Sequence, residues 1–478
     1  MCIKIFRKVS SSMRNTYCVT KVLFQYLEVP LSVNIRISSV MHEAIVPNRT
    51  SATKVGIQTD IRQTAVARDA YSGTKKSTSS VNHKLEGSKE KFSKDVLEYL
   101  NSKDYLKSVL YCLPQKLLKR KRSNPDALYT VDRDVAKKLV DVIALDVVKG
   151  GAPVFEVNPG LGFISRELLA AGVQRLWLSE SSLAFSQQLK DLKTEFTEKI
   201  EIVNKDLFTL PKLAFQDNQD GGSRVRSLFR GVPKSEWKDD PVMKIVGVLP
   251  SLSFIKYIIQ SHVFQHGVMA LGRPEFYFVM TPAHYFCLTC QPGDGYFFYR
   301  STSVLFQLIF EWCLLEKLPR TGFLPWEMKR GTKRWSKVAK VHNIDPGTMY
   351  LVKIVPRKNF FQTVVSADQL QPLWFFVRHN LISRKNRVIP QLEIYSLDRK
   401  WIPGCGSRFI VDGMTIFTQF GDLTPQEILT VFHKFISWPE YGVCPFHAVM
   451  ETTFMRMESG IDSTGKDSDD EIEEDEES

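Results

Sequence analysis

Short apolar segments alternate with segments of helical periodicity from about residue 105 onward, and this alternation constrains the fold more than any other feature. Each apolar segment has the length of a buried strand and ends near glycine, an acid or proline. Strand and helix in alternation predict a parallel, doubly wound α/β sheet, whose ligands lie at the carboxyl ends of the strands. The predicted strands are residues 152–157, 175–180, 200–205, 242–249, 276–281 and 349–355, and helices are predicted over 163–171 and 303–317.

Polar residues follow the first three of these strands. The first strand runs into the turn Asn158-Pro159-Gly160-Leu161-Gly162, the second ends at Glu180 and the third at Asp206. Glycine lets backbone approach a ligand closely, while Glu180 is placed to accept hydrogen bonds from a ribose diol and Asp206 from an adenine amino group. Together the three strand ends predict an adenosine-containing ligand. The alternative is a tight turn with two solvated loop acids, and the glycine turn alone would also suit a dinucleotide.

These motifs resemble, in order, those of the rRNA adenine dimethyltransferase family of the KsgA type. The resemblance rests on residues 156–162, Glu180, Asp206 and 246–251, on the upstream stretch 128–135, and on 384–387 with 422–425. It covers about 105–450 and implies a Rossmann-like class I methyltransferase sheet with helices on both faces, followed by a small C-terminal helical domain. It also implies the cofactor S-adenosyl-L-methionine, bound by Thr130, Glu156, Asn158, Gly160, Gly162, Glu180 and Asp206.

The end of the fourth strand departs from the family pattern. The resemblance implies that active members end this strand Asn-Leu-Pro-Tyr, where the Asn and Pro carbonyls accept hydrogen bonds from the target adenine and the aromatic ring stacks on it. This chain has Val248, Leu249, Pro250 and Ser251 at those positions. Valine cannot orient an amino group and serine offers no stacking face. We therefore predict weak or lost methyl transfer and assign no catalytic residue.

The two ends of the chain differ from its middle in charge. Residues 1–90 hold fourteen Lys or Arg and six acids, a net charge of +8, and no acid precedes Glu28. Basic, Ser- and Thr-rich sequence with amphipathic spacing predicts a mitochondrial transit peptide followed by a disordered linker. A basic tail with no targeting role is the alternative. Residues 458–478 carry a net charge of −10 and predict a disordered acidic tail.

Between these ends we predict a methyltransferase-like domain over 105–365 and a C-terminal helical domain over 366–457. Residues 91–457 carry a net charge of +14, which favours a polyanionic partner. Trp335 and Trp374 lie among the basic residues and could stack on bases if exposed. Any one basic cluster taken alone could equally be a solvated face. The residues predicted to bind nucleic acid are Lys329, Arg330, Lys333, Arg334, Trp335, Arg384, Lys385 and Arg387.

Within the family, the basic N-terminus and residues 349–357 look most like the mitochondrial transcription-factor branch. This resemblance implies a protein of the mitochondrial matrix and nucleoid that joins mitochondrial RNA polymerase at promoter DNA. Such a protein helps to melt the start site and holds the single-stranded template. The alternatives are an active dimethyltransferase of mitochondrial small-subunit rRNA and an assembly factor that binds rRNA without modifying it.

Three other features carry smaller predictions. His284, Cys287 and Cys290 have the spacing of metal ligands, but we prefer a helical turn with its sulfurs packed inward and predict no metal. Residues 211–240 predict an insertion loop between the third and fourth strands. No apolar run reaches the roughly 18 residues that would span a bilayer, so no membrane contact is predicted.

Overall fold

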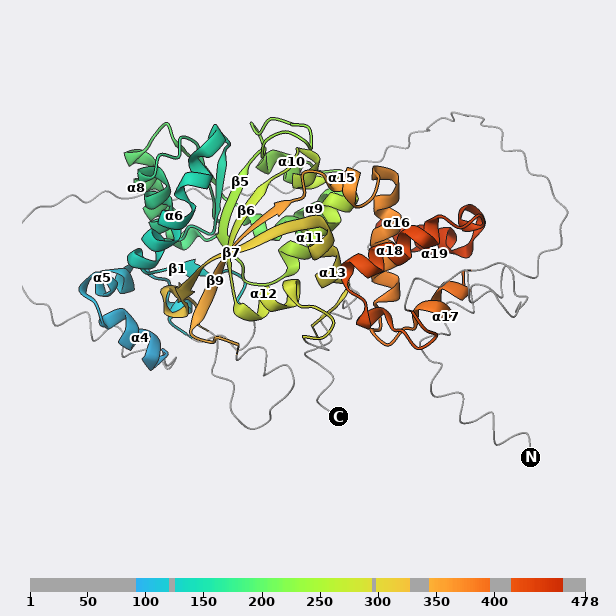
Figure 1. Cartoon of the computed structure of the whole chain (residues 1–478). Helices are drawn as coiled ribbons and strands as arrows, with labels where there is room; N and C mark the ends of the chain where they lie inside the picture. The colour runs from blue at the N-terminus through green and yellow to red at the C-terminus, as the bar shows by residue number, and fades with distance from the viewer. Residues whose placement is uncertain (1–91, 120–124, 295–297, 327–343, 396–413, 459–478) are drawn as a thin grey trace, which may run out of the picture. The chain divides into compact units, whose positions relative to one another are not determined.

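A seven-stranded sheet organises the part of the chain that the computed structural model describes, which is residues 92–119, 125–294, 298–326, 344–395 and 414–458 (Figure 1). All of these residues belong to one unit, Ser79–Ser478. In spatial order the strands are β4 (Ile200–Val203), β3 (Leu176–Ser179), β2 (Val154–Val157), β5 (Lys244–Val248), β6 (Glu275–Met280), β9 (Thr348–Pro356) and β7 (Phe310–Pro319).

The five strands from β4 to β6 are parallel, so their carboxyl ends lie at one edge of the sheet. The chain builds β2, β3 and β4 outward in one direction and then returns to add β5 on the other side of β2. This reversal of strand order is a topological switch point, the place where open α/β sheets bind their ligands.

Helices cover both faces of the sheet, as predicted. Side chains of β5 and β6 alternate between two cores: Ile245 and Phe276 belong to one, Val246 and Tyr277 to the other. This alternation follows from the two-residue period of a strand that is buried on both faces. The helices that precede β7 in the sequence are α4 (Lys94–Asn101), α5 (Asp104–Cys112), α6 (Arg133–Val148), α7 (Phe163–Ala170), α8 (Ser186–Glu195), α9 (Leu210–Asp220), α10 (Arg224–Leu228), α11 (Ser253–Val263), α12 (Pro282–Thr289) and α13 (Ser301–Ile309).

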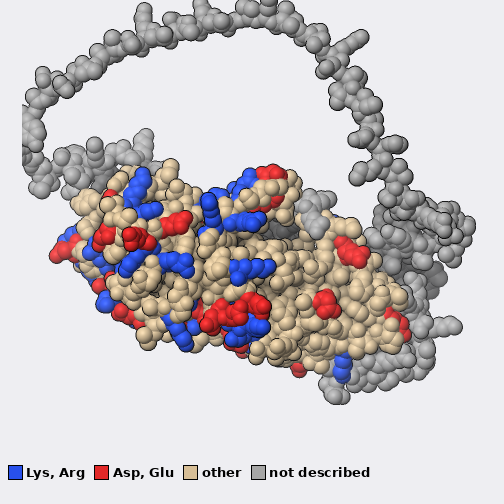
Figure 2. All heavy atoms as spheres, turned by 90° about the horizontal axis from the view of Figure 1, so that it is seen from above, with Lys and Arg blue, Asp and Glu red and all other residues tan. Residues whose placement is uncertain are grey.

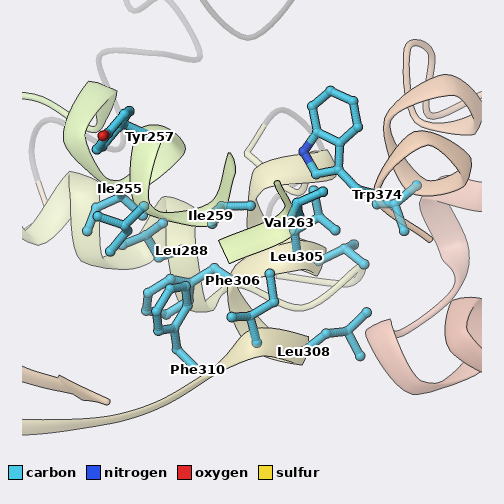
Figure 3. Packing of buried hydrophobic residues seen from close by; sticks show 14 of the residues in the cluster. Ile255, Tyr257, Ile259, Val263, Leu288, Leu305, Phe306, Leu308, Phe310 and Trp374 are labelled. Carbon is cyan, nitrogen blue, oxygen red and sulfur yellow. The ribbon is translucent and has the colours of Figure 1, made fainter. Parts of the chain in front are cut away.

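Of the C-terminal helices, α16 and α18 pack on α13, and one continuous apolar core joins this part of the chain to the sheet. Figure 3 shows part of this core, with Ile259 and Val263 of α11, Leu305 and Leu308 of α13, and Trp374 among the side chains drawn. The helices of this part are α15 (Phe360–Thr363), α16 (Leu370–Asn380), α17 (Val388–Glu393), α18 (Pro425–Ile436) and α19 (Pro445–Glu458).

Two predictions about the far side of the sheet are wrong. The sheet is mixed, because β9 runs antiparallel to both β6 and β7. The helix predicted over 303–317 stops at Ile309, and Phe310 begins β7 with no turn residue between them. Residues 310–319 form a strand because they pair with β9. Exposed Glu311 and Cys313 alternate with more buried neighbours, as in a strand.

The loop predicted over 211–240 is also wrong in part, because α9 and α10 lie within it. Pro211 suits the first turn of α9, where a missing amide hydrogen costs nothing. Gly221 follows the helix with φ of +66°, the left-handed conformation that commonly ends helices. The Gly221-Gly222 pair therefore marks a helix end and not a long irregular loop.

Within the described ranges, no helix combines the length and the apolar character needed to cross a bilayer.

Candidate functional site

The turn after β2 brings backbone to the switch point in left-handed conformations. Asn158, Gly160 and Gly162 have φ values of +55°, +57° and +73°. A Cβ atom at Gly160 would lie 2.8 Å from Cδ1 of Tyr129, closer than carbon atoms pack. Tyr129 is held there by the short strand β1 (Tyr129–Thr130), which pairs with β8 (Phe323–Leu324). Only glycine fits at position 160, whereas asparagine tolerates the same backbone region at 158.

Glu180, the residue after β3, faces this turn. Its carboxylate accepts hydrogen bonds from the amides of Ser182 (2.7 Å) and Gly160 (3.2 Å), and the Tyr129 hydroxyl lies 3.5 Å from Oε1. Only 4% of Glu180 is exposed, and this burial raises its pKa. The backbone amides orient the carboxylate, so it is preorganised to accept hydrogen bonds.

Asp206, after β4, is linked to the same turn. Its Oδ1 atom accepts hydrogen bonds from the amide of Phe208 (2.9 Å) and from Nδ2 of Asn158 (3.2 Å). Burial raises the pKa of this carboxyl group as well. The ends of β2, β3 and β4 therefore form one connected polar site, as the sequence predicts for the first three strand ends.

Two atoms at this edge are buried with no hydrogen-bond partner among the described residues: Oγ1 of Thr130 and Oδ1 of Asn158. A buried polar atom left unpaired costs about 1–3 kcal/mol. A nucleoside with hydroxyl and amino groups could supply the missing partners, so the residues present fit S-adenosylmethionine. When bound, that cofactor would supply a transferable methyl group.

Glu156 lies in β2, and its side chain is engaged within the protein. Its Oε2 atom accepts a hydrogen bond of 2.6 Å from the Ser165 hydroxyl of α7, and the residue is 1% exposed. Burial raises its pKa to about 8. Glu156 thus ties α7 to the sheet beneath the glycine turn.

Because of this raised pKa, Glu156 should lower the free energy of unfolding as pH rises, and Glu156→Gln should remove that pH dependence. Between the ordinary carboxyl pKa of 4.5 and about 8, the folded protein holds one more proton than the unfolded chain, so stability falls as pH rises. We expect the two proteins to be similarly stable at pH 5 and the Gln variant to be more stable by a few kcal/mol at pH 8. Urea unfolding at both values measures this, and a difference independent of pH would contradict it.

The fourth strand end differs from the polar site beside it. Val248, the last residue of β5, is 3% exposed, pairs in register with Val279 and packs in the apolar core. Ser251 is half-buried, and its hydroxyl oxygen lies 3.2 Å from that of Ser253. Neither side chain presents an amide or a ring to a base.

Residues 119–436 match the sequence model of the family described as ribosomal RNA adenine dimethylase. The chain belongs to the ribosomal RNA adenine dimethylase family. The predicted family resemblance is thereby confirmed, together with the α/β methyltransferase fold. The family is one of methyltransferases, so the fold of this chain is one that binds S-adenosylmethionine.

The relatives include proteins named as mitochondrial. The chain is 37% identical over 388 residues to dimethyladenosine transferase 2, mitochondrial, of Drosophila melanogaster, covering 73% of this chain and 84% of that protein. The protein of the same name from Homo sapiens is 24% identical over 273 residues, covering 55% and 67%. A crystal structure of the 23S rRNA methyltransferase ErmE is 16% identical and covers 64% of this chain and 99% of its own, with a TM-score of 0.40.

The residues predicted to bind nucleic acid are either outside the described residues, exposed or buried. Lys329, Arg330, Lys333, Arg334 and Trp335 lie outside the described residues, as do the predicted transit peptide and acidic tail. Lys385 and Arg387 are exposed. Figure 2 shows one face, on which Lys and Arg side chains lie among Asp and Glu and do not form one continuous basic surface. Net charge alone therefore does not locate a nucleic-acid site.

The predictions that Arg384 binds nucleic acid and that Trp374 stacks on bases are wrong. Arg384 is 4% exposed and donates hydrogen bonds to the carbonyls of Gly421 (2.6 Å) and Pro292 (3.3 Å), so it is not available to a phosphate. Trp374 is 3% exposed and packs against Phe264 and Phe454, so it cannot stack on a base. No sequence signal separates Arg384 from its neighbours, because its burial depends on the distant carbonyls of Gly421 and Pro292.

The predicted helical turn near the cysteines is α12, where Cys290 is 2% exposed as predicted, whereas Cys287 is only half-buried. Its sulfur lies 3.9 Å from the Ser303 hydroxyl of α13. Within the part of the chain that the structure describes, no three His, Cys, Asp or Glu residues gather closely enough to hold a metal ion.

Proposed function

We propose that this family member is a mitochondrial transcription initiation factor that assists mitochondrial RNA polymerase in melting promoter DNA and in holding the single-stranded template. The observation that carries the proposal is the contrast at the carboxyl edge: Glu180 and Asp206 keep the nucleoside site, whereas Val248 and Ser251 replace the groups that would position a target base. A protein with this edge retains a scaffold for nucleic acid without efficient chemistry on it.

The mitochondrial location is part of the same proposal. Its support is the basic, acid-poor N-terminus together with the mitochondrial names of the relatives from Drosophila melanogaster and Homo sapiens. Matrix import of the full chain into isolated mitochondria, with cleavage of an N-terminal segment, is the direct test.

The second candidate is an active dimethyltransferase of mitochondrial small-subunit rRNA. It is favoured by the family and by the preorganised carboxylate of Glu180, which would suit a bound cofactor. An assembly factor that binds rRNA without modifying it shares the scaffold and differs only in its partner.

Run-off transcription separates these candidates. Purified mitochondrial RNA polymerase is assayed on a duplex promoter and on the same promoter melted in advance, with and without this protein. We expect stimulation mainly on the duplex, because a melted start site no longer needs help to open. Absence of stimulation on both templates would reject the transcription role, and methylation of an rRNA hairpin would then favour the enzyme.

Glu180→Ala should separate cofactor binding from transcription. Loss of the carboxylate removes a charged acceptor, and hydrogen bonds to charged groups contribute about 1.5–3 kcal/mol, so we expect affinity for S-adenosylhomocysteine to fall at least tenfold. Run-off transcription should remain near that of the unsubstituted protein. Calorimetric titration measures the first effect, and melting temperature shows whether the variant is folded. A transcription defect in a stably folded variant would mean that the nucleoside site takes part in initiation.

A further inference from the structure

A tight turn in the C-terminal part holds two large apolar side chains in solvent. Ile416 and Phe417 are 57% and 65% exposed. The turn is fixed on both sides, because the Thr415 amide donates to the Thr418 hydroxyl at 2.8 Å and the Thr418 amide donates to the Thr415 carbonyl at 3.0 Å. The Phe417 amide also donates to the Thr415 hydroxyl at 3.2 Å. An exposed phenylalanine at a hydrogen-bonded turn calls for a role outside the core.

Residues 384–387 lie beside this turn. Arg384 and Lys385 belong to a second turn, in which the Asn386 amide donates to the Ser383 carbonyl at 3.0 Å, and Arg387 immediately precedes α17. The Val388 amide donates to the Thr418 carbonyl at 2.9 Å, and Arg387 faces Gln419 in an antiparallel bridge. Arg384 is buried, whereas Lys385 and Arg387 are exposed.

Arg387 and the Phe417 ring form one surface. The Arg387 guanidinium lies 5.3 Å from the centre of the Phe417 ring, within cation–π range. Within the described ranges neither Lys385 nor Arg387 has an ion pair with Asp or Glu. The positive charge of Arg387 therefore adjoins an aromatic ring that remains largely open to solvent, and exposed Lys385 lies two residues away along the chain.

We propose that Phe417, Lys385 and Arg387 form a contact site for single-stranded nucleic acid, in which a base stacks on Phe417 and the cations bind the flanking phosphates. Aromatic rings beside basic side chains are the combination that binds single strands, since every base has a face to stack and every linkage a charge. A protein partner would use Ile416 as readily as Phe417 and would gain little from two unpaired cations. This inference rests on the proposed nucleic-acid role and assigns the residues that perform it.

Fluorescence anisotropy with the full chain and a labelled twelve-nucleotide single strand tests the site. Stacking is worth about 1–3 kcal/mol per base, so Phe417→Leu should weaken binding roughly tenfold while Phe417→Tyr stays close to the unsubstituted protein. The matched control Ile416→Ala should change affinity less than twofold. Lys385→Gln and Arg387→Gln should each reduce the salt slope of log K by about 0.7, while Phe417→Leu leaves the slope unchanged.

The outcomes distinguish this inference from the broader proposal. If the unsubstituted chain binds no single strand, the proposed nucleic-acid role fails. If it binds and Phe417→Leu binds equally well, the role stands and Phe417 is not a stacking residue. If Ile416→Ala and Phe417→Leu both impair stimulation of the polymerase without changing affinity for the oligonucleotide, the surface binds protein and the inference is overturned.

Discussion

Methyl transfer from S-adenosylmethionine to an rRNA hairpin should be roughly a hundredfold slower with this chain than with a relative whose fourth strand ends Asn-Leu-Pro-Tyr. The reason lies at the end of β5. Val248 is buried in the apolar core and Ser251 carries only a hydroxyl, so neither holds the target amino group in line with the methyl donor. Transfer of labelled methyl groups under single-turnover conditions measures the rate directly.

The double substitution Val248→Asn, Ser251→Tyr should recover at least tenfold of that rate, because it restores both an amide and a ring at the edge. Asparagine at a site only 3% exposed costs about 1–3 kcal/mol if its amide stays unpaired, so melting temperature must accompany the assay. Ser253→Tyr is the matched control, since it adds a ring at an exposed neighbour. Equal rates for the unsubstituted chain and the Asn-Leu-Pro-Tyr relative would show that these positions do not limit the chemistry.

Arg384→Ala should lower the free energy of unfolding by about 3 kcal/mol. The substitution leaves the buried carbonyl of Gly421 without its 2.6 Å donor, and each unsatisfied buried group costs about 1–3 kcal/mol. It also removes the guanidinium 5.5 Å from the ring centre of Tyr299, whose hydroxyl donates to the Leu423 carbonyl. A small cavity adds to the loss.

Urea unfolding compares this variant with Lys385→Ala, which should stay within about 0.5 kcal/mol of the unsubstituted protein because Lys385 is exposed. The two variants should have the opposite relative effects on nucleic-acid affinity. Lys385→Ala should weaken binding, while Arg384→Ala should leave the affinity of the folded fraction unchanged. If both variants were equally stable, the buried role of Arg384 would be wrong.

The polar edge at the carboxyl ends of β2, β3 and β4 could be predicted because local signals and the fold agree there. A strand followed by glycines, and two strands followed by acids, need only the parallel arrangement to bring Gly160, Glu180 and Asp206 together. The rule for parallel sheets supplies that arrangement without knowledge of any particular contact. The site residues therefore follow from positions along the sequence.

The wrong predictions concern residues whose conformation or burial depends on contacts with distant parts of the sequence. Ser301 to Pro319 contains no internal glycine or proline before its end, and only pairing with β9, which begins at Thr348, makes its second half a strand. Arg384 carries the same charge as its neighbours, and its burial depends on Gly421. Exposed Phe417 looks like any core phenylalanine, because the sequence does not show that the Thr415 turn holds it outward.

The direct connection from α13 to β7 limits how far the C-terminal helices can move relative to the sheet. Ile309 ends a helix that packs on α16 and α18, and Phe310 begins a strand at the sheet edge, with no residue between them to act as a hinge. The C-terminal helices and the sheet should therefore move as one rigid body. A nucleic acid that touches both Phe417 and the carboxyl edge must bend to match the protein, because the protein has no joint there with which to close around it.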